Sequence, residues 1–124
     1  MAKILIADDD AILIEMLRFR LENARHQVVT AADGLAALDR AKSEPIDLIV
    51  LDSMMPVIAG PEVLARLKTD PKTVDIPVVM LTARSGETDV VTALKGGASE
   101  YLTKPFIPQE LMIRIEKLLL QRRR

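Results

Sequence analysis

Acidic, hydroxyl and amine side chains follow successive apolar runs of this 124-residue chain. Asp8 and Asp9 come after the first run, Asp52 follows the third, and Thr82 and Lys104 follow the fourth and fifth. If the three carboxylates share one pocket, like charges about 4 Å apart repel by ~4 kcal/mol at an effective dielectric of about 20. Such a cluster needs a cation or a raised pKa. Oxygen-only ligands point to Mg²⁺, held together with a phosphoryl group.

The remaining polar groups suit phosphoryl transfer. Its transition state spreads negative charge over oxygens and is stabilised by metal ions, cations and hydrogen-bond donors. Lys104 and Thr82 are such donors. A carboxylate can itself be the nucleophile and form an acyl phosphate. Asp52 is the candidate, because it stands alone after its apolar run, whereas Asp8 and Asp9 are paired for metal binding.

Short apolar runs alternate with helical patterns five times, and no repeat or linker interrupts them. Strands are predicted at 4–7, 28–31, 46–51, 76–81 and 100–103. The helices between and after them have boundary signals at Asp33, Pro45, Gly60-Pro61, Gly96-Gly97 and Pro108. The fourth helix, expected over 87–95, is rich in β-branched residues, so we expect packing rather than propensity to hold it.

Near-continuous apolar strands separated by helices are typical of a parallel sheet that helices cover on both faces. We therefore expect an α/β, doubly wound (βα)5 domain. Open sheets of this kind bind ligands beyond the carboxyl ends of their strands, where the polar residues above are expected to lie.

Composition limits the possible functions. The 17 basic and 18 acidic residues leave a net charge of -1, which provides no general field for nucleic acid or an anionic membrane. The absence of cysteine excludes disulfides and thiol chemistry. No run approaches the roughly 20 apolar residues of a membrane span, and no signal peptide is apparent. A cytoplasmic location without direct membrane or nucleic-acid binding is expected.

Four motifs in order resemble the receiver domains of two-component response regulators, the CheY-like family. They are ILIADDD at 4–10, LDSMMP at 51–56, LTAR at 81–84 and YLTKPF at 101–106. The resemblance covers essentially the whole chain, so residues 1–124 are expected to form one receiver domain. It implies a flavodoxin-like sheet of strand order 2-1-3-4-5.

The resemblance also implies a ligand set and a reaction. Asp52 would take a phosphoryl group from a sensor histidine kinase or a histidine phosphotransfer protein. Mg²⁺ would be held by Asp9, Asp52 and the main-chain carbonyl of Met54, and Asp8 would hold a metal-bound water. Lys104 would contact the phosphoryl oxygens. The chain would be a phosphoacceptor that assists its own phosphorylation and dephosphorylation rather than an enzyme.

A switch is implied as well. Thr82 would contact the phosphoryl group, and Tyr101 would follow Thr82 inward, changing the face formed by the fourth helix, fifth strand and fifth helix. The fourth helix would be mobile and could change its conformation at a small cost in free energy. Met54 and Arg84 match positions that modulate acyl-phosphate lifetime. A cis peptide is implied between Lys104 and Pro105.

Other residues have simpler interpretations. Asp10 is expected to cap a helix. His26, the single histidine, lies between polar neighbours and is expected to be a solvated turn residue. The sequence departs from the family pattern at Ala59, Pro61 and Ile107, none of which is a proposed ligand. At Ile107 a usual capping side chain is missing, which should cost the last helix ~1 kcal/mol.

Three alternative functions fit the sequence less well. A metal-dependent aspartyl phosphohydrolase usually needs a second acid two residues after its nucleophile, where this chain has Met54. A flavodoxin-type cofactor site would meet repulsion between its phosphate and Asp8 and Asp9. A receiver-like module that binds partners without phosphorylation would not need the complete acceptor set. Lys95, Glu100, Glu110 and Arg114 would provide a mixed-charge face for a homodimer through the fourth helix, fifth strand and fifth helix.

Overall fold

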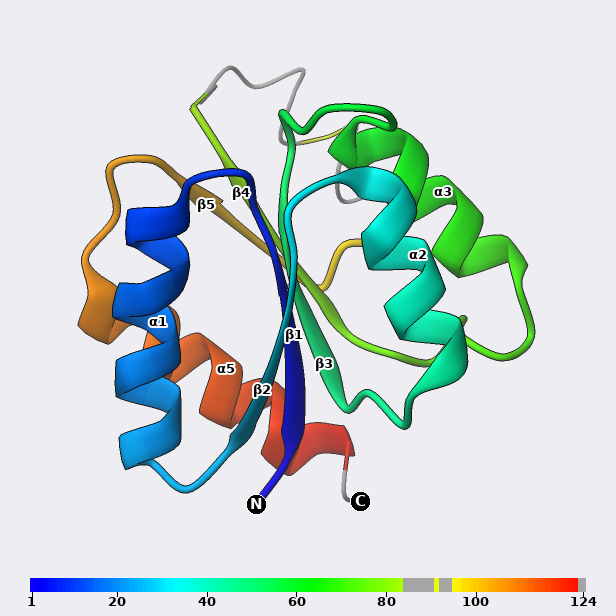
Figure 1. Cartoon of the computed structure of the whole chain (residues 1–124). Helices are drawn as coiled ribbons and strands as arrows, with labels where there is room; N and C mark the ends of the chain where they lie inside the picture. Colours follow the sequence, from blue (N-terminus) through cyan, green and yellow to red (C-terminus); the bar gives the residue numbers. More distant parts are fainter. Residues whose placement is uncertain (84–90, 92–94, 123–124) are drawn as a thin grey trace.

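Five parallel strands form the middle layer of the computed structural model, which describes residues 1–83, 91 and 95–122 (Figure 1). Their order in the sheet is β2-β1-β3-β4-β5, which confirms the expected topology. The strands are β1 (Lys3–Ala7), β2 (Gln27–Ala31), β3 (Leu48–Asp52), β4 (Val78–Thr82) and β5 (Glu100–Thr103). The strands β1 and β3 are neighbours, but the chain after β1 continues toward β2 and the chain after β3 continues toward β4. These connections run in opposite directions, which opens a crevice at the carboxyl ends of β1 and β3.

Helices cover both faces of the sheet (Figure 1). One face carries α1 (Ala11–Asn23) and α5 (Pro108–Arg122), and the other carries α2 (Gly34–Ser43) and α3 (Gly60–Thr69). The helix expected over 87–95 falls mostly on residues outside the described part of the chain, so its structure and mobility stay predictions. None of the helices in the described part is long and apolar enough to cross a bilayer.

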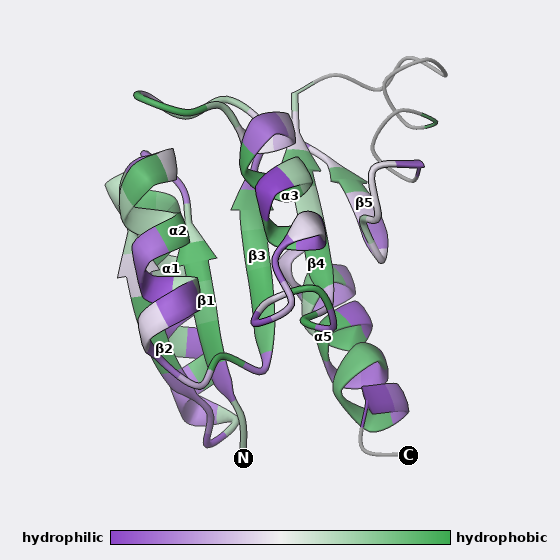
Figure 2. Cartoon of the chain, turned by 90° about the vertical axis from the view of Figure 1, so that its right-hand side faces the viewer, coloured by the Kyte–Doolittle hydropathy of each residue, from purple (hydrophilic) through white to green (hydrophobic). Residues whose placement is uncertain are grey.

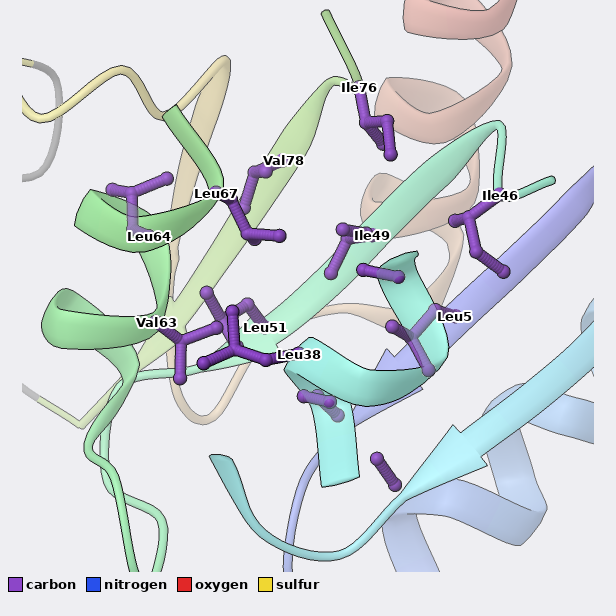
Figure 3. Close-up of a cluster of buried hydrophobic side chains, with 14 of the residues drawn as sticks. Leu5, Leu38, Ile46, Ile49, Leu51, Val63, Leu64, Leu67, Ile76 and Val78 are labelled. Atoms are coloured by element: carbon purple, nitrogen blue, oxygen red, sulfur yellow. The ribbon is translucent and has the colours of Figure 1, made fainter. Parts of the chain in front are cut away.

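Alternate residues along the strands belong to two hydrophobic cores, one on each face of the sheet. Leu5, Ile49 and Val78 point toward α2 and α3, where Figure 3 shows them packed with residues such as Leu38 and Leu67. The neighbouring residues of the same strands pack instead against α1 and α5. All five residues of β3 and of β4 are buried, and both strands appear hydrophobic in Figure 2. Burial on both faces explains why these strands read as unbroken apolar runs.

Strand boundaries differ from the sequence prediction in an informative way. Both β3 and β4 begin two residues later than expected and end one residue later. The added last residues are Asp52 and Thr82, which are polar but remain in register with Leu81 and Thr103 of the neighbouring strands. The two functional candidates are thus the last residues of their strands rather than loop residues, and the sheet fixes their backbones.

The helix boundaries follow their signals. Asp10 caps α1, because its Oδ1 accepts hydrogen bonds from the N–H groups of Ile12 at 3.0 Å and Leu13 at 3.2 Å. Asp33 caps α2 in the same manner. Gly97, in the turn before β5, has a φ of +104°, a conformation that favours glycine. The capping predictions for the first two helices are confirmed.

The prediction for His26 is wrong. Only 8% of this residue is exposed, and its ring contacts the backbone of Ala2 and the side chain of Glu116. The turn after α1 brings residue 26 back against the sheet, where the N–H of Gln27 donates to the carbonyl of Ala2. Polar sequence neighbours suggested a solvated ring, but the backbone path places it inside the molecule.

Candidate functional site

The predicted site residues converge at the carboxyl edge of the sheet. Asp8 follows β1, Asp52 ends β3, Thr82 ends β4, and Lys104 follows β5. Parallel pairing aligns these ends, because Ala7 lies opposite Leu51 and Thr82 lies opposite Thr103. Sheet topology therefore assembles residues that lie up to 96 positions apart in the sequence.

Three carboxylates form the centre of the site. One oxygen from each of Asp8, Asp9 and Asp52 lies within 4.8 Å of the others. Asp8 and Asp52 are buried, whereas Asp9 is exposed. Burial raises the pKa of the Asp52 carboxyl, and the neighbouring charge of Asp8 raises it further. The ionised cluster is electrostatically unfavourable without positive charge.

Lys104 supplies one positive charge to this cluster. Its Nζ lies 3.0 Å from Oδ2 of Asp8 and 3.4 Å from Oδ1 of Asp52. Burial opposes the charged ammonium, but the hydrogen bond and charge of Asp8, followed by those of Asp52, outweigh it and raise the pKa of Lys104. Within the described part of the chain, Lys104 is the cation paired with this cluster, and its charge offsets one of the three carboxylate charges. Negative charge therefore remains for a metal ion to neutralise.

Asp10 has a second role that was not predicted from the sequence. Its backbone N–H donates to Oδ1 of Asp8 at 2.9 Å, while its side chain caps α1. Both carboxylate oxygens of Asp8 are therefore engaged, one by this N–H and the other by Lys104. The start of α1 thus fixes the orientation of the most buried acid.

The loop between β3 and α3 packs tightly beneath Asp52. A Cβ placed on Gly60 would lie 2.3 Å from the carbonyl oxygen of Asp52, so only glycine fits there. The Met54 N–H donates to the Asp52 carboxylate and lowers its pKa, against the larger effect of burial. The Met54 side chain is 60% exposed. From the sequence, Gly60 was predicted only as a helix start. Its position eight residues after Asp52 was the signal for this closer role.

Thr82 and Tyr101 share a cavity with Asp9 of the acidic cluster. Thr82 is buried, and its carbonyl accepts the Lys104 N–H at 2.6 Å. Tyr101 is half-buried on β5, in register with Met80. Both residues border a mostly apolar cavity of about 750 Å³ that extends to Asp9.

Two further expectations concern this edge. The peptide bond between Lys104 and Pro105 is cis, as expected. Arg84 lies outside the described residues, so its role in acyl-phosphate lifetime stays a prediction.

The donor set fits a hard divalent cation. The three clustered groups are all carboxylates, and Mg²⁺ and Ca²⁺ prefer such oxygen ligands. Two of the three carboxylates are buried. The cluster can therefore hold a metal ion. The choice between these ions depends on the number of ligands and retained waters.

Comparison with known proteins identifies the family. The sequence profile described as "Response regulator receiver domain" matches residues 4–116. The chain belongs to this family of signalling domains, whose function as phosphoacceptors agrees with the site.

Individual relatives agree with this assignment. The chain is 42% identical over 117 residues to the alkaline phosphatase synthesis transcriptional regulatory protein PhoP of Bacillus subtilis, a match covering 94% of this chain and 48% of PhoP. It is 44% identical over 117 residues to the phosphate regulon transcriptional regulatory protein PhoB of Escherichia coli, covering 94% and 51%. The chain thus spans about half the length of these curated relatives.

A solved structure supports the fold. The receiver domain of the Francisella response regulator 1452 superposes with a TM-score of 0.92 at 33% identity, covering 98% of both chains. The strand order and the layers of helices are therefore those of an experimentally determined receiver domain.

Proposed function

We propose that Asp52 accepts a phosphoryl group, in a Mg²⁺-dependent reaction, from a sensor histidine kinase or a histidine phosphotransfer protein. The observation that carries this proposal is the position of Asp52 in a cluster of three carboxylates, with the Lys104 ammonium 3.4 Å from its Oδ1. In this reaction an oxygen of Asp52 forms the new O–P bond while the P–N bond to the donor imidazole breaks. The imidazole recovers a proton as it leaves.

Each neighbouring group has a proposed part in this step. Asp9, Asp52 and the Met54 carbonyl would hold the metal ion, and Asp8 would hold a water molecule bound to it. When bound, Mg²⁺ supplies positive charge between the carboxylates and the phosphoryl oxygens. The Lys104 ammonium, already beside Asp52, would contact the transferred group.

The signal would pass through Thr82 and Tyr101. The Thr82 hydroxyl would donate to a phosphoryl oxygen, and the Tyr101 ring would move inward. Support comes from the cavity of about 750 Å³ that both residues border, which provides apolar space for the ring. The face of β5 and α5, together with the helix expected from the sequence over 87–95, would change as a result, because a phosphoryl group that interacts better with one arrangement shifts the population toward it.

This face is also the proposed surface for a homodimer. Ile113 is exposed on α5, while Arg114 pairs with Glu100 and Glu110 of its own chain. Sedimentation with and without a beryllium fluoride mimic of the phosphoryl group tests the proposal. A dimer should increase with the mimic, and an unchanged monomer in both conditions would contradict it.

Residues 1–124 are proposed to act as one receiver domain in the cytoplasm, as a phosphoacceptor and not as an enzyme with turnover of external substrates. The alternative of a metal-dependent aspartyl phosphohydrolase has less support, because Met54 stands where a general acid would be needed.

Incubation with Mg²⁺ and acetyl phosphate, followed by intact-mass measurement, tests the phosphoacceptor proposal. The protein should gain the mass of one phosphoryl group, and Asp52→Asn or chelation of the metal should abolish the gain. Asp39→Asn, which removes an exposed acid on α2, is the matched control and should behave as the wild type. Steady hydrolysis of unrelated phosphomonoesters would favour the phosphohydrolase instead.

A further inference from the structure

His26 joins three elements at the edge of the sheet opposite the acidic cluster. Its Nδ1 lies 3.1 Å from the backbone nitrogen of Ala2, the residue just before β1. Its Nε2 lies 2.6 Å from Oε2 of Glu116 on α5. Its own N–H donates to the carbonyl of Leu21 in the last turn of α1. The side chain is only 5% exposed, so water does not compete strongly for either ring nitrogen.

The two partners fix the position of the ring proton. A backbone N–H can only donate, so Nδ1 must accept the hydrogen bond from Ala2 and carries no proton. In a neutral imidazole the proton then lies on Nε2, which donates to the carboxylate of Glu116. The arrangement therefore selects one neutral tautomer of His26, with both ring nitrogens satisfied.

Protonation would alter one contact and keep the other. A second proton on Nδ1 would face the N–H of Ala2, and two donors cannot share a hydrogen bond. The contact with Glu116 would persist as an ion pair. We propose that His26 is a proton-controlled latch, which ties the start of β1 to α5 when neutral and releases Ala2 when protonated.

The packing makes this release consequential. Ala2 is 6% exposed and belongs to the same hydrophobic cluster as Ile115, Leu118 and Leu119 of α5. Loosening Ala2 therefore loosens the contact between the first strand and the last helix. Since α5 forms part of the proposed output face, proton binding at His26 and a change in that face would be coupled.

Charged residues on the elements around His26 form ion pairs with other groups or are exposed. The Lys3 ammonium on β1 pairs with Glu44 at 2.9 Å, and Glu22 on α1 lies 3.7 Å from Arg18. Arg25, in the turn before β2, and Lys117, which follows Glu116 on α5, are exposed. Among the described residues, the Glu116 carboxylate is the acidic group that contacts the His26 ring.

Nuclear magnetic resonance of ¹⁵N-labelled protein can test the latch directly, because the chain has a single histidine. At a pH of about 8 the ring signals should show an unprotonated Nδ1 and a protonated Nε2. As the pH falls to about 5, the protection factor of the Ala2 amide against hydrogen exchange should drop roughly three- to tenfold, with the midpoint of the His26 titration.

Two variants make the test specific. Glu116→Gln keeps an acceptor for Nε2 but removes the negative charge, so the midpoint should move to lower pH while the tautomer stays the same. Glu110→Gln removes a carboxylate from the same helix and should leave the midpoint unchanged. A proton on Nδ1 at a pH of about 8, or a His26 titration that leaves Ala2 unaffected, would overturn the proposal.

Discussion

Replacing Lys104 with methionine should make folding strongly dependent on Mg²⁺. Among the residues that the structure describes, the Lys104 ammonium is the cation paired with the acidic cluster, 3.0 Å from Asp8 and 3.4 Å from Asp52. Lys104→Met preserves much of the side-chain stem and removes the charge. Asp8 is fully buried, so its ionised carboxylate would lose its ion-pair partner without gaining water.

The size of the effect follows from this geometry. Each contact corresponds to roughly 5 kcal/mol of Coulomb attraction at an effective dielectric of about 20, before the desolvation of the ammonium is subtracted. Removing one partner of a fully buried pair costs about 3–5 kcal/mol. The Lys104 side chain is 26% exposed, so we reduce this figure to about 2 kcal/mol. A change of this size lowers the urea midpoint by about 1 M.

Magnesium should largely reverse the loss. The variant has no ammonium competing for Asp8 and Asp52, so its Mg²⁺ affinity should rise by about tenfold, which corresponds to about 1.4 kcal/mol. Metal at a hundred times its dissociation constant contributes about 2.7 kcal/mol of stability. Urea unfolding with a chelator and with excess Mg²⁺, together with calorimetric titration of the metal, measures both quantities.

Lys72→Met removes an exposed lysine from the segment after α3 and should change neither the midpoint nor the metal affinity. If Lys104→Met unfolds at the wild-type urea concentration in chelator and binds Mg²⁺ no more tightly, then the ammonium does not stabilise or compete for the carboxylates. The electrostatic description of the site would then be wrong.

Three further changes probe the site and its loop. Burial raises the pKa of Asp52, so the folded state loses stability as the pH rises through this pKa and Asp52 ionises. Asp52→Asn should therefore raise the urea midpoint in chelator at neutral pH. The gain should vanish below about pH 4, where the carboxyl is protonated in the unfolded chain as well. Gly60→Ala should lose about 2–3 kcal/mol in urea unfolding and slow phosphorylation, because the new Cβ would displace the Asp52 backbone. Val57 is exposed and has a φ of +70°, a conformation that favours glycine, so Val57→Gly should raise the free energy of unfolding by about 0.5–1 kcal/mol. Ala59→Gly is the control, because Ala59 has a φ of -69° and should not be stabilised by glycine.

The layered fold could be predicted because its signals are local. The first four residues of β3 (48–51) and of β4 (78–81) are all apolar, as a sheet buried on both faces requires. The carboxyl ends of β3 and β4 were predicted one residue too early, because the last residues of these strands, Asp52 and Thr82, are polar. A polar residue can pair in a sheet as well as an apolar one, and hydropathy does not record backbone hydrogen bonds.

Sequence distance does not explain which contacts could be predicted. Lys104 and Asp8 are 96 residues apart, yet their meeting was expected, because the carboxyl ends of parallel strands converge at one edge and both residues follow strands. His26 and Glu116 are 90 residues apart, and their contact was missed. No topological rule specifies which helix residue faces the opposite edge of a sheet. That contact depends on the axial position and rotation of α5, which side-chain packing in the core determines.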